Sequence, residues 1–223
     1  MKERPILFSD PMVRAILDGR KTQTRRLLKP MPPSPEDVRA KGGVGPSFIA
    51  SDRERDMWRP CGSVWAVRDA CGAEQWRCPY GAAGDRLWVR ETWNRDGGAI
   101  SYRADGDWIA DYLGATTEPS HVPKWRPSIF LKREDSRIAL EVTSVRVERL
   151  ADISEADANA EGVDAMDGVI DEVALCHRAK EMGETPTDAR VWFSVLWDSI
   201  NGERAAWASN PWVWAVEFKM VQP

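Results

Sequence analysis

Residues 137–150 read RIALEVTSVRVERL, and residues 212–218 read WVWAVEF. The first stretch alternates polar and apolar side chains, which predicts one long β-strand or two strands joined at a bend. The second predicts a closing strand, and shorter runs predict strands at 6–8, 87–93, 99–103 and 108–112. Many strands with few short helices favour an α+β fold, namely a small, mostly antiparallel β-barrel decorated with short helices.

The helices expected between these strands are short. Residues that favour the ends of a helix mark two of them: Asp10 and Gly19 for the first, and Ser154 and Gly162 for the second, where Ser154 and Asp157 resemble a capping box. Further helical patterns lie near 169–182 and from Thr187 onward. In the last pattern four apolar residues predict a buried face: Val191, Val195, Trp197 and Ile200.

The composition is that of a globular protein, with 223 residues, of which 43% are hydrophobic and 30% charged. No stretch approaches the roughly 18 uncharged apolar residues of a membrane helix, and no signal peptide is visible. We therefore expect a cytoplasmic protein without a membrane partner. We expect a single domain spanning 1–223 with two insertions: the segment 31–83, which is rich in Pro and Gly, and the segment 163–186.

Charge is distributed unevenly along the chain, although the formal net charge is only -4. Residues 1–30 contain eight Lys and Arg against three acidic residues, whereas residues 151–189 contain eleven Asp and Glu against two basic ones. A phosphate-bearing partner is attracted to the first region and repelled by the second. The acidic segment is expected to face solvent or a protein partner.

The cysteines and histidines do not form a familiar metal motif. Cys61, Cys71 and Cys78 are separated by nine and six residues, whereas zinc sites usually contain closely spaced pairs. The two histidines, His121 and His177, are too few for a three-histidine metal centre. We expect no metal and no cofactor, with reduced thiols at the cysteines.

The main candidates for catalytic residues lie in the segment GRKTQTRR, residues 19–26. Lys21 and Thr24 are three residues apart, so a turn after Gly19 would bring them to one side, whereas an extended chain would separate them. A lysine kept neutral by neighbouring cations can take a proton from a threonine hydroxyl. The neighbours that would lower the Lys21 pKa are Arg20, Arg25 and Arg26. The competing interpretation is a basic surface loop.

A carboxylate on an apolar strand face forms the second signal. Alternation in residues 87–93 places Glu91 with Leu87, Val89 and Trp93. A glutamate in such surroundings must be paired or functional. We therefore expect Glu91 to supply an acid or a counter-charge to Lys21.

These motifs resemble the ASCH domains of the PUA-like superfamily. The pattern Gly19-x-Lys21-x-x-Thr24-x-Arg26 matches the G-x-K-x-x-[ET]-x-R signature of that family, and GDRLWVRE at 84–91 is similar to its second characteristic strand. Strand 137–150, the helix ending in Glu161-Gly162 and the closing helix and strand follow in the expected order. The resemblance covers 4–30, 84–150 and 187–220, and is strongest to phage and prophage members that carry insertions.

The resemblance implies a β-barrel with a cleft for RNA, DNA or a nucleoside. Some bacterial ASCH proteins remove the acyl group of acetylated cytidine without a metal, using Lys, Thr and Glu. On that pattern Thr24 is the nucleophile, Lys21 its activator and Glu91 the acid/base residue of an amidohydrolase. Other members are RNA-binding or ribonucleolytic, so a non-catalytic binding module, a ribonuclease and a phage accessory protein acting through a protein partner stay open.

Further residues are candidates for contacts with a base or a phosphate. Stacking platforms are expected from Trp93, Tyr102 and Trp125, although a tryptophan in a strand is more often part of the core. Contacts to phosphate or carbonyl oxygen are expected from Arg20, Arg25, Arg26 and Arg90.

Overall fold

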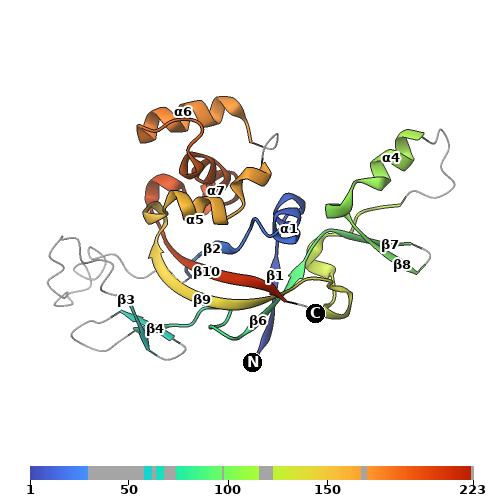
Figure 1. Cartoon of the computed structure of the whole chain (residues 1–223), viewed down its shortest axis with the longest axis horizontal. Coiled ribbons are helices and arrows are strands. Elements are labelled where there is room, and N and C mark those ends of the chain that lie inside the picture. The colour runs from blue at the N-terminus through green and yellow to red at the C-terminus, as the bar shows by residue number, and fades with distance from the viewer. Residues whose placement is uncertain are drawn as a thin grey trace, which may run out of the picture.

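The computed structural model describes residues 1–29, 58–61, 64–67, 74–96, 98–115, 123–166 and 170–221. Its main feature is a curved five-stranded sheet (Figure 1). Across the sheet the strands follow in the order β1 (Glu3–Leu7), β6 (Arg86–Arg90), β9 (Ala139–Arg149), β10 (Trp212–Val221) and β2 (Gln23–Leu27). Strands β1 and β6 are parallel, and all other neighbours are antiparallel. The predicted α+β class is confirmed.

The two long strands β9 and β10 form the centre of the sheet. Their pairing runs from Trp212 opposite Arg149 to Val221 opposite Ala139, with one irregularity between Glu217 and Phe218. Residues 137–150 therefore contain one strand rather than two. Because β10 is covered on both faces, residues 212–216 are all buried.

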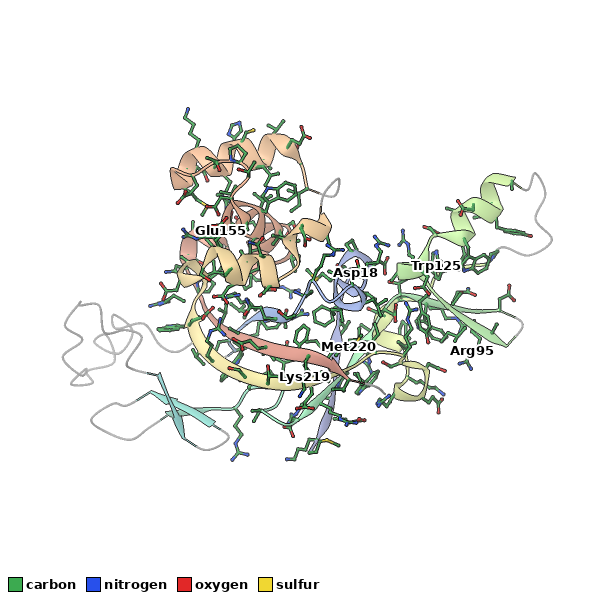
Figure 2. All side chains as sticks on the ribbon, in the orientation of Figure 1. Asp18, Arg95, Trp125, Glu155, Lys219 and Met220 are labelled. Atoms are coloured by element: carbon green, nitrogen blue, oxygen red, sulfur yellow. The ribbon has the colours of Figure 1, made fainter. Side chains whose placement is uncertain are left out.

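Alternate residues of the sheet enter two separate cores. One core contains Ile6, Phe8, Leu87, Val89, Leu140, Val142, Trp214 and Phe218. The other lies between the sheet and the helices α5 (Glu155–Ala160) and α7 (Ala189–Ala205), and contains Leu150, Val163, Phe193, Trp197, Trp207 and Val213. Side chains fill the space between sheet and helices in Figure 2. Helix α6 (Glu172–Met182) packs against α7.

Smaller elements surround this centre. Helix α1 (Asp10–Leu17) connects β1 to β2, and helix α4 (Trp108–Ala115) extends to one side with the hairpin β7 (Trp93–Asp96) and β8 (Ala99–Tyr102), where Trp125 also lies (Figure 2). A separate three-stranded sheet comprises β3 (Trp58–Cys61), β4 (Val64–Val67) and β5 (Glu74–Trp76). Short 3-10 turns lie at Arg103–Asp105, Ser128–Phe130, Arg133–Asp135, Leu150–Asp152, Val163–Met166 and Trp207–Ser209.

Two strand predictions were wrong. Residues 108–112 lie in helix α4, where the Asp107 side chain accepts a hydrogen bond of 3.2 Å from the Ala110 N–H in the first turn. Residues 87–93 are not one strand, because the chain leaves the sheet after Arg90 and joins a different hairpin at Trp93. The helix ends were predicted better: Gly19 and Gly162 have φ of 73° and 76°, and the Asp157 N–H donates to Ser154 Oγ at 3.1 Å.

Closure of the sheet into the expected barrel is not seen in the part of the chain that the structure describes. Strands β1 and β2 end the sheet on its two sides and do not pair as strands. A side chain links them instead, since Arg26 Nη2 donates to the Leu7 carbonyl at 2.7 Å. The described helices include none that is long and apolar enough to cross a membrane.

Candidate functional site

In the GRKTQTRR segment the turn lies at Gly19, before Lys21, rather than between Lys21 and Thr24. Gly19 takes a left-handed φ of 73°, and the N–H groups of Arg20 and Lys21 both donate to the Ala15 carbonyl, at 2.8 and 2.9 Å. From Gln23 the chain is an extended strand. The turn across Lys21 to Thr24 that would align these two side chains locally is therefore absent.

Lys21 lies in a fully buried ion pair. Its side chain is 0% exposed, and its Nζ donates to Glu161 Oε2 at 2.9 Å and to the Glu161 carbonyl at 2.7 Å. Burial lowers the pKa of Lys21, and the positive charges of Arg26 and Arg25 act in the same direction, while the Glu161 carboxylate opposes them. The Nζ also lies 5.5 Å from the centre of the Phe8 ring.

A glycine allows the chain to approach this pair. Gly162 has φ of 76°, and a Cβ added there would lie 3.0 Å from Lys21 Cβ and 3.1 Å from Ala15 Cβ. The neighbouring backbone is closed by a 2.9 Å hydrogen bond from the Thr22 N–H to the Ala160 carbonyl. Only a residue without a side chain fits here without displacing Lys21.

Arg25 is held by carboxylates from several elements. Its Nη2 contacts Glu148 at 2.6 Å and Asp157 at 3.3 Å, and its Nη1 contacts Glu161 at 3.3 Å. The Arg25 side chain is 0% exposed. This arrangement neutralises Arg25 within the protein and fixes Glu161 from a second direction.

A cavity of about 360 Å³ lies beside this network. Four of its lining residues are consecutive in β2: Thr24, Arg25, Arg26 and Leu27. Its other lining residues come from the end of β1, from α1, from α7 and from three connecting segments: Leu7, Phe8, Ser9, Met12, Thr92, Ser128, Glu161, Phe193, Leu196, Trp197, Ile200 and Asn201. Thr24 and Glu161 thus line the same cavity. Lys21 is not among the lining residues, but it is bonded to Glu161.

Glu91 has a different set of partners. It is 0% exposed, and its two carboxylate oxygens accept hydrogen bonds from Arg137 at 3.0 Å each, while Arg137 also pairs with Asp105 at 2.8 Å. Burial raises the pKa of Glu91, against the effect of Arg137. Glu91 does not line the cavity, although its neighbour Thr92 does. The expected pairing of this carboxylate is present, with Arg137 rather than Lys21.

The expected stacking residues lie outside the cavity lining. Trp93 is buried and lies against Arg126, with 4.9 Å from the guanidinium carbon to the ring centre. Tyr102 donates to the Asp135 carbonyl at 2.6 Å, and Trp125 Nε1 donates to Asp107 at 2.7 Å. The aromatic residues that do line the cavity are Phe8, Phe193 and Trp197.

The other predicted arginines are distributed around the site. Arg20 is partly exposed and pairs with Asp18 at 2.7 Å and Asp164 at 2.9 Å. Arg90 lies over the Trp88 ring at 4.6 Å. Arg26 lines the cavity and lies 5.3 Å from the Phe8 ring centre, so it is the predicted arginine best placed to meet a ligand.

Two features of the site were missed from sequence. Glu161 is separated from Lys21 by 140 residues, and the only signal for it was its place before a helix-stopping glycine. Ile200 was expected to be buried, but it is 57% exposed and lines the cavity mouth beside Asn201.

The described residues contain no group of three His, Cys, Asp or Glu that could hold a metal ion. Cys78 is buried, and burial raises its pKa to about 11. The side chains of Cys61 and Cys71, and all of His121, fall outside the described residues.

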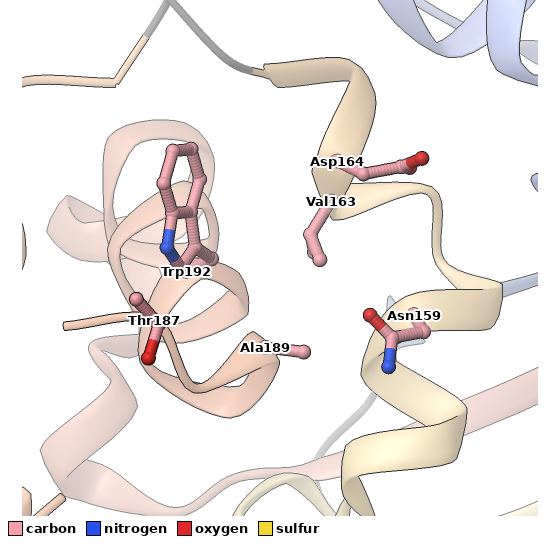
Figure 3. Close-up of a pocket in the computed structure, with 6 residues that line it drawn as sticks. All are labelled: Asn159, Val163, Asp164, Thr187, Ala189 and Trp192. Carbon is pink, nitrogen blue, oxygen red and sulfur yellow. The ribbon is translucent and has the colours of Figure 1, made fainter. Parts of the chain in front are cut away.

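Another cavity, of about 330 Å³, lies between α5 and the start of α7 (Figure 3). It is lined by Asn159, Val163, Asp164, Thr187, Ala189 and Trp192. Its one carboxylate, Asp164, already pairs with Arg20. This cavity brings together no pair of groups suited to catalysis. We take the cavity at β2, which Thr24 and Glu161 both line, as the candidate functional site.

Gly162→Ala is expected to destabilise the protein more than Gly183→Ala. Both glycines have a left-handed φ, of 76° and 70°, but no atom lies within 4 Å of a Cβ added at Gly183. The left-handed backbone alone costs about 1–2 kcal/mol. The close contacts at Gly162 add about 1–3 kcal/mol. Urea unfolding of both variants measures the difference, and equal losses would show that the packing around Lys21 is not tight.

Arg137→Gln is expected to lower the free energy of unfolding by about 3–5 kcal/mol, because it leaves the Glu91 carboxylate buried without a cation. The control is Arg133→Gln, which removes an exposed pair with Glu3 worth about 1 kcal/mol or less. Since burial raises the pKa of Glu91 above 4.5, Glu91 binds a proton as the pH falls, and the loss should shrink toward pH 4.5. A loss no larger than the control's at pH 7 would contradict this account.

No family model matches the chain, and no curated protein matches it. Among solved structures, the chain is similar to the crystal structure of protein EF3133 from Enterococcus faecalis V583, whose description names the family DUF984. The sequence identity is 10% and the TM-score 0.33, and the alignment covers 94% of this chain and 66% of that chain. The ASCH resemblance stays a prediction.

Proposed function

We propose that the chain binds a pyrimidine nucleoside in the cavity at β2 and hydrolyses an amide on its base without a metal. The observation that carries the proposal is the convergence of three groups: Thr24 and Glu161 line one cavity, and the fully buried Lys21 is bonded to Glu161. A hydroxyl, a carboxylate and a lysine of lowered pKa are the components of a metal-independent acyl transfer.

The cavity has the composition of a small-molecule site. Its volume of about 360 Å³ is within the range of roughly 300–1,000 Å³ typical of such sites. Eight of the sixteen lining residues are apolar or aromatic, and eight are polar or charged. Phe8, Phe193 and Trp197 offer surfaces for a flat ring, and Thr24, Arg26 and Glu161 offer polar contacts.

The proposed chemistry proceeds in two steps. The Thr24 hydroxyl attacks the amide carbonyl and passes its proton to neutral Lys21; the C–N bond then breaks, and the leaving amine takes up that proton. Water next attacks the threonyl ester and gives a proton to the Lys21–Glu161 pair; the ester C–O bond then breaks, the Thr24 oxygen takes that proton back, and the acid is released. The net reaction is amide plus water to carboxylic acid plus amine, and nothing is oxidised or reduced.

The carboxylate in this proposal is Glu161 rather than Glu91. Glu161 is in direct contact with Lys21, whereas Glu91 accepts two hydrogen bonds from the Arg137 guanidinium. We therefore assign Glu161 to hold and polarise Lys21, and Glu91 to a supporting ion pair under the β7–β8 hairpin.

The arrangement of Arg25 favours this proposal over a module that grips phosphates. A phosphate contact needs a cation that is free and accessible. Arg25 is buried and contacts three carboxylates, and Arg20 is already paired with two. Binding of RNA without turnover is the alternative to this proposal.

Thr24→Ala is expected to reduce kcat/KM for N4-acylated cytidines by about 10²–10⁴-fold. Thr24→Ser, which keeps the hydroxyl, should retain most of the activity. Glu161→Gln should reduce activity like Thr24→Ala, whereas Glu91→Gln should leave turnover per folded molecule unchanged. Release of cytidine, measured by chromatography with folding checked by circular dichroism, distinguishes these cases. Loss of turnover in a folded Glu91→Gln protein, with activity kept in Glu161→Gln, would return the carboxylate role to Glu91.

The pH dependence tests the role assigned to Lys21. Because burial lowers its pKa below the ordinary 10.5, and the neutral amine is the reactive form, kcat/KM should rise with pH and level off below pH 10.5. Lys21→Arg, whose guanidinium keeps its proton, should show no such rise. Activity that falls as the pH is raised from about 6 to 9 would contradict a neutral lysine.

A further inference from the structure

The cavity follows an edge of the sheet rather than one of its faces. In a strand, successive side chains point to opposite faces. Thr24 is paired with Val216, which belongs to the first core, whereas Leu27 is paired with Val213, which belongs to the second. Residues 24–27 all line the cavity, although they point alternately to the two faces. Only a cavity that runs along the strand's edge meets all four.

The hydrogen-bond pattern shows which backbone groups point to that edge. The Phe218 N–H donates to the Thr22 carbonyl at 2.8 Å, and the Leu28 N–H donates to the Trp212 carbonyl at 3.0 Å. Antiparallel partners exchange bonds at every second residue, so Thr24 and Arg26 face β10. The N–H and C=O groups of Arg25 and Leu27 therefore point away from β10, where the described chain contains no further strand.

A side chain that crosses the cavity from β2 to its opposite wall leaves one donor without a partner among the described residues. Leu7, Phe8 and Ser9, at the end of β1, line that wall, and the Arg26 side chain crosses to the Leu7 carbonyl at 2.7 Å. The Nε of Arg26 is buried and has no acceptor among the described residues. A ligand with an acceptor beside Arg26 would satisfy a donor that the protein leaves unpaired.

We propose that the backbone N–H and C=O of Arg25 form hydrogen bonds with the base, as they would with a neighbouring strand. The ligand is a planar ring that presents a donor beside an acceptor on one edge, as cytosine does with its amino group and N3. The inference rests on the proposed function and identifies the atoms that select the substrate. Such contacts need no particular side chain at position 25, which leaves Arg25 free for its carboxylates.

A flat base suits this edge better than a peptide strand. An added strand needs a clear path of about 3.3 Å per residue along β2. The Arg26 side chain crosses that path to Leu7. A ring that lies within the edge beside Arg25, against Phe8 or Phe193, avoids the crossing.

The test is amide hydrogen exchange by NMR on the full chain, free and with saturating cytidine. In the free protein the Arg25 and Leu27 amides should exchange faster than those of Thr24 and Arg26, which are bonded to β10. Cytidine should slow the Arg25 amide by at least about tenfold. The matched probe 3-methylcytidine, which has the same ring and sugar but a blocked N3, should lose this protection.

The outcomes separate this inference from the proposed function. Protection of the Arg25 amide in the free protein, equal to that of Thr24, would overturn the inference and leave the proposed function standing. Binding of cytidine without a change at Arg25, or equal protection by 3-methylcytidine, would do the same. Absence of binding by cytidine and by N4-acetylcytidine would overturn both.

Discussion

The buried pair between Lys21 and Glu161 is the interaction on which the rest of the site depends. It joins the turn before β2 to the residue that follows α5, and these two positions are 140 residues apart in the chain. Removing both charges from water is costly, and the cost is offset only when each group is well bonded. Lys21 has two acceptors on Glu161, and Arg25 supports the same carboxylate from the other side. Gly162 then allows the close approach of the two segments.

Strand β2 contacts three different parts of the fold. One edge pairs with β10, one face meets α5 and α7, and the other face joins the core around Phe8. Its polar side chains Gln23 and Arg25 both contact Asp157 of α5, which attaches this helix to the sheet, and Arg25 also bonds to Glu148 of β9. The free edge is left between the helices and the end of β1. Strand β2 therefore supplies both structural polar contacts and part of the lining of the candidate site.

The strands could be predicted from the sequence better than the residues of the candidate site. Alternation in 137–150 predicted β9 because half of a two-faced strand must be apolar, and Ser154 and Gly162 marked α5 through local backbone chemistry. Local patterns carry no information on which distant carboxylate meets Lys21, so Glu161 was missed and Glu91 was chosen from its apolar neighbours. The aromatic residues Trp93 and Trp125 were assigned by type, whereas the lining residues Phe8 and Phe193 follow from how β1 and α7 pack.

A double-mutant cycle on the free energy of unfolding tests the central pair most directly. Lys21→Met and Glu161→Gln should each cost about 3–5 kcal/mol, because each leaves a buried polar group without its partner. The double variant should cost clearly less than the two losses added, by about 1 kcal/mol or more. That result would establish the pair as the element that organises β2, α5 and the cavity. Strictly additive losses would show that the two side chains do not depend on each other, and would contradict the account.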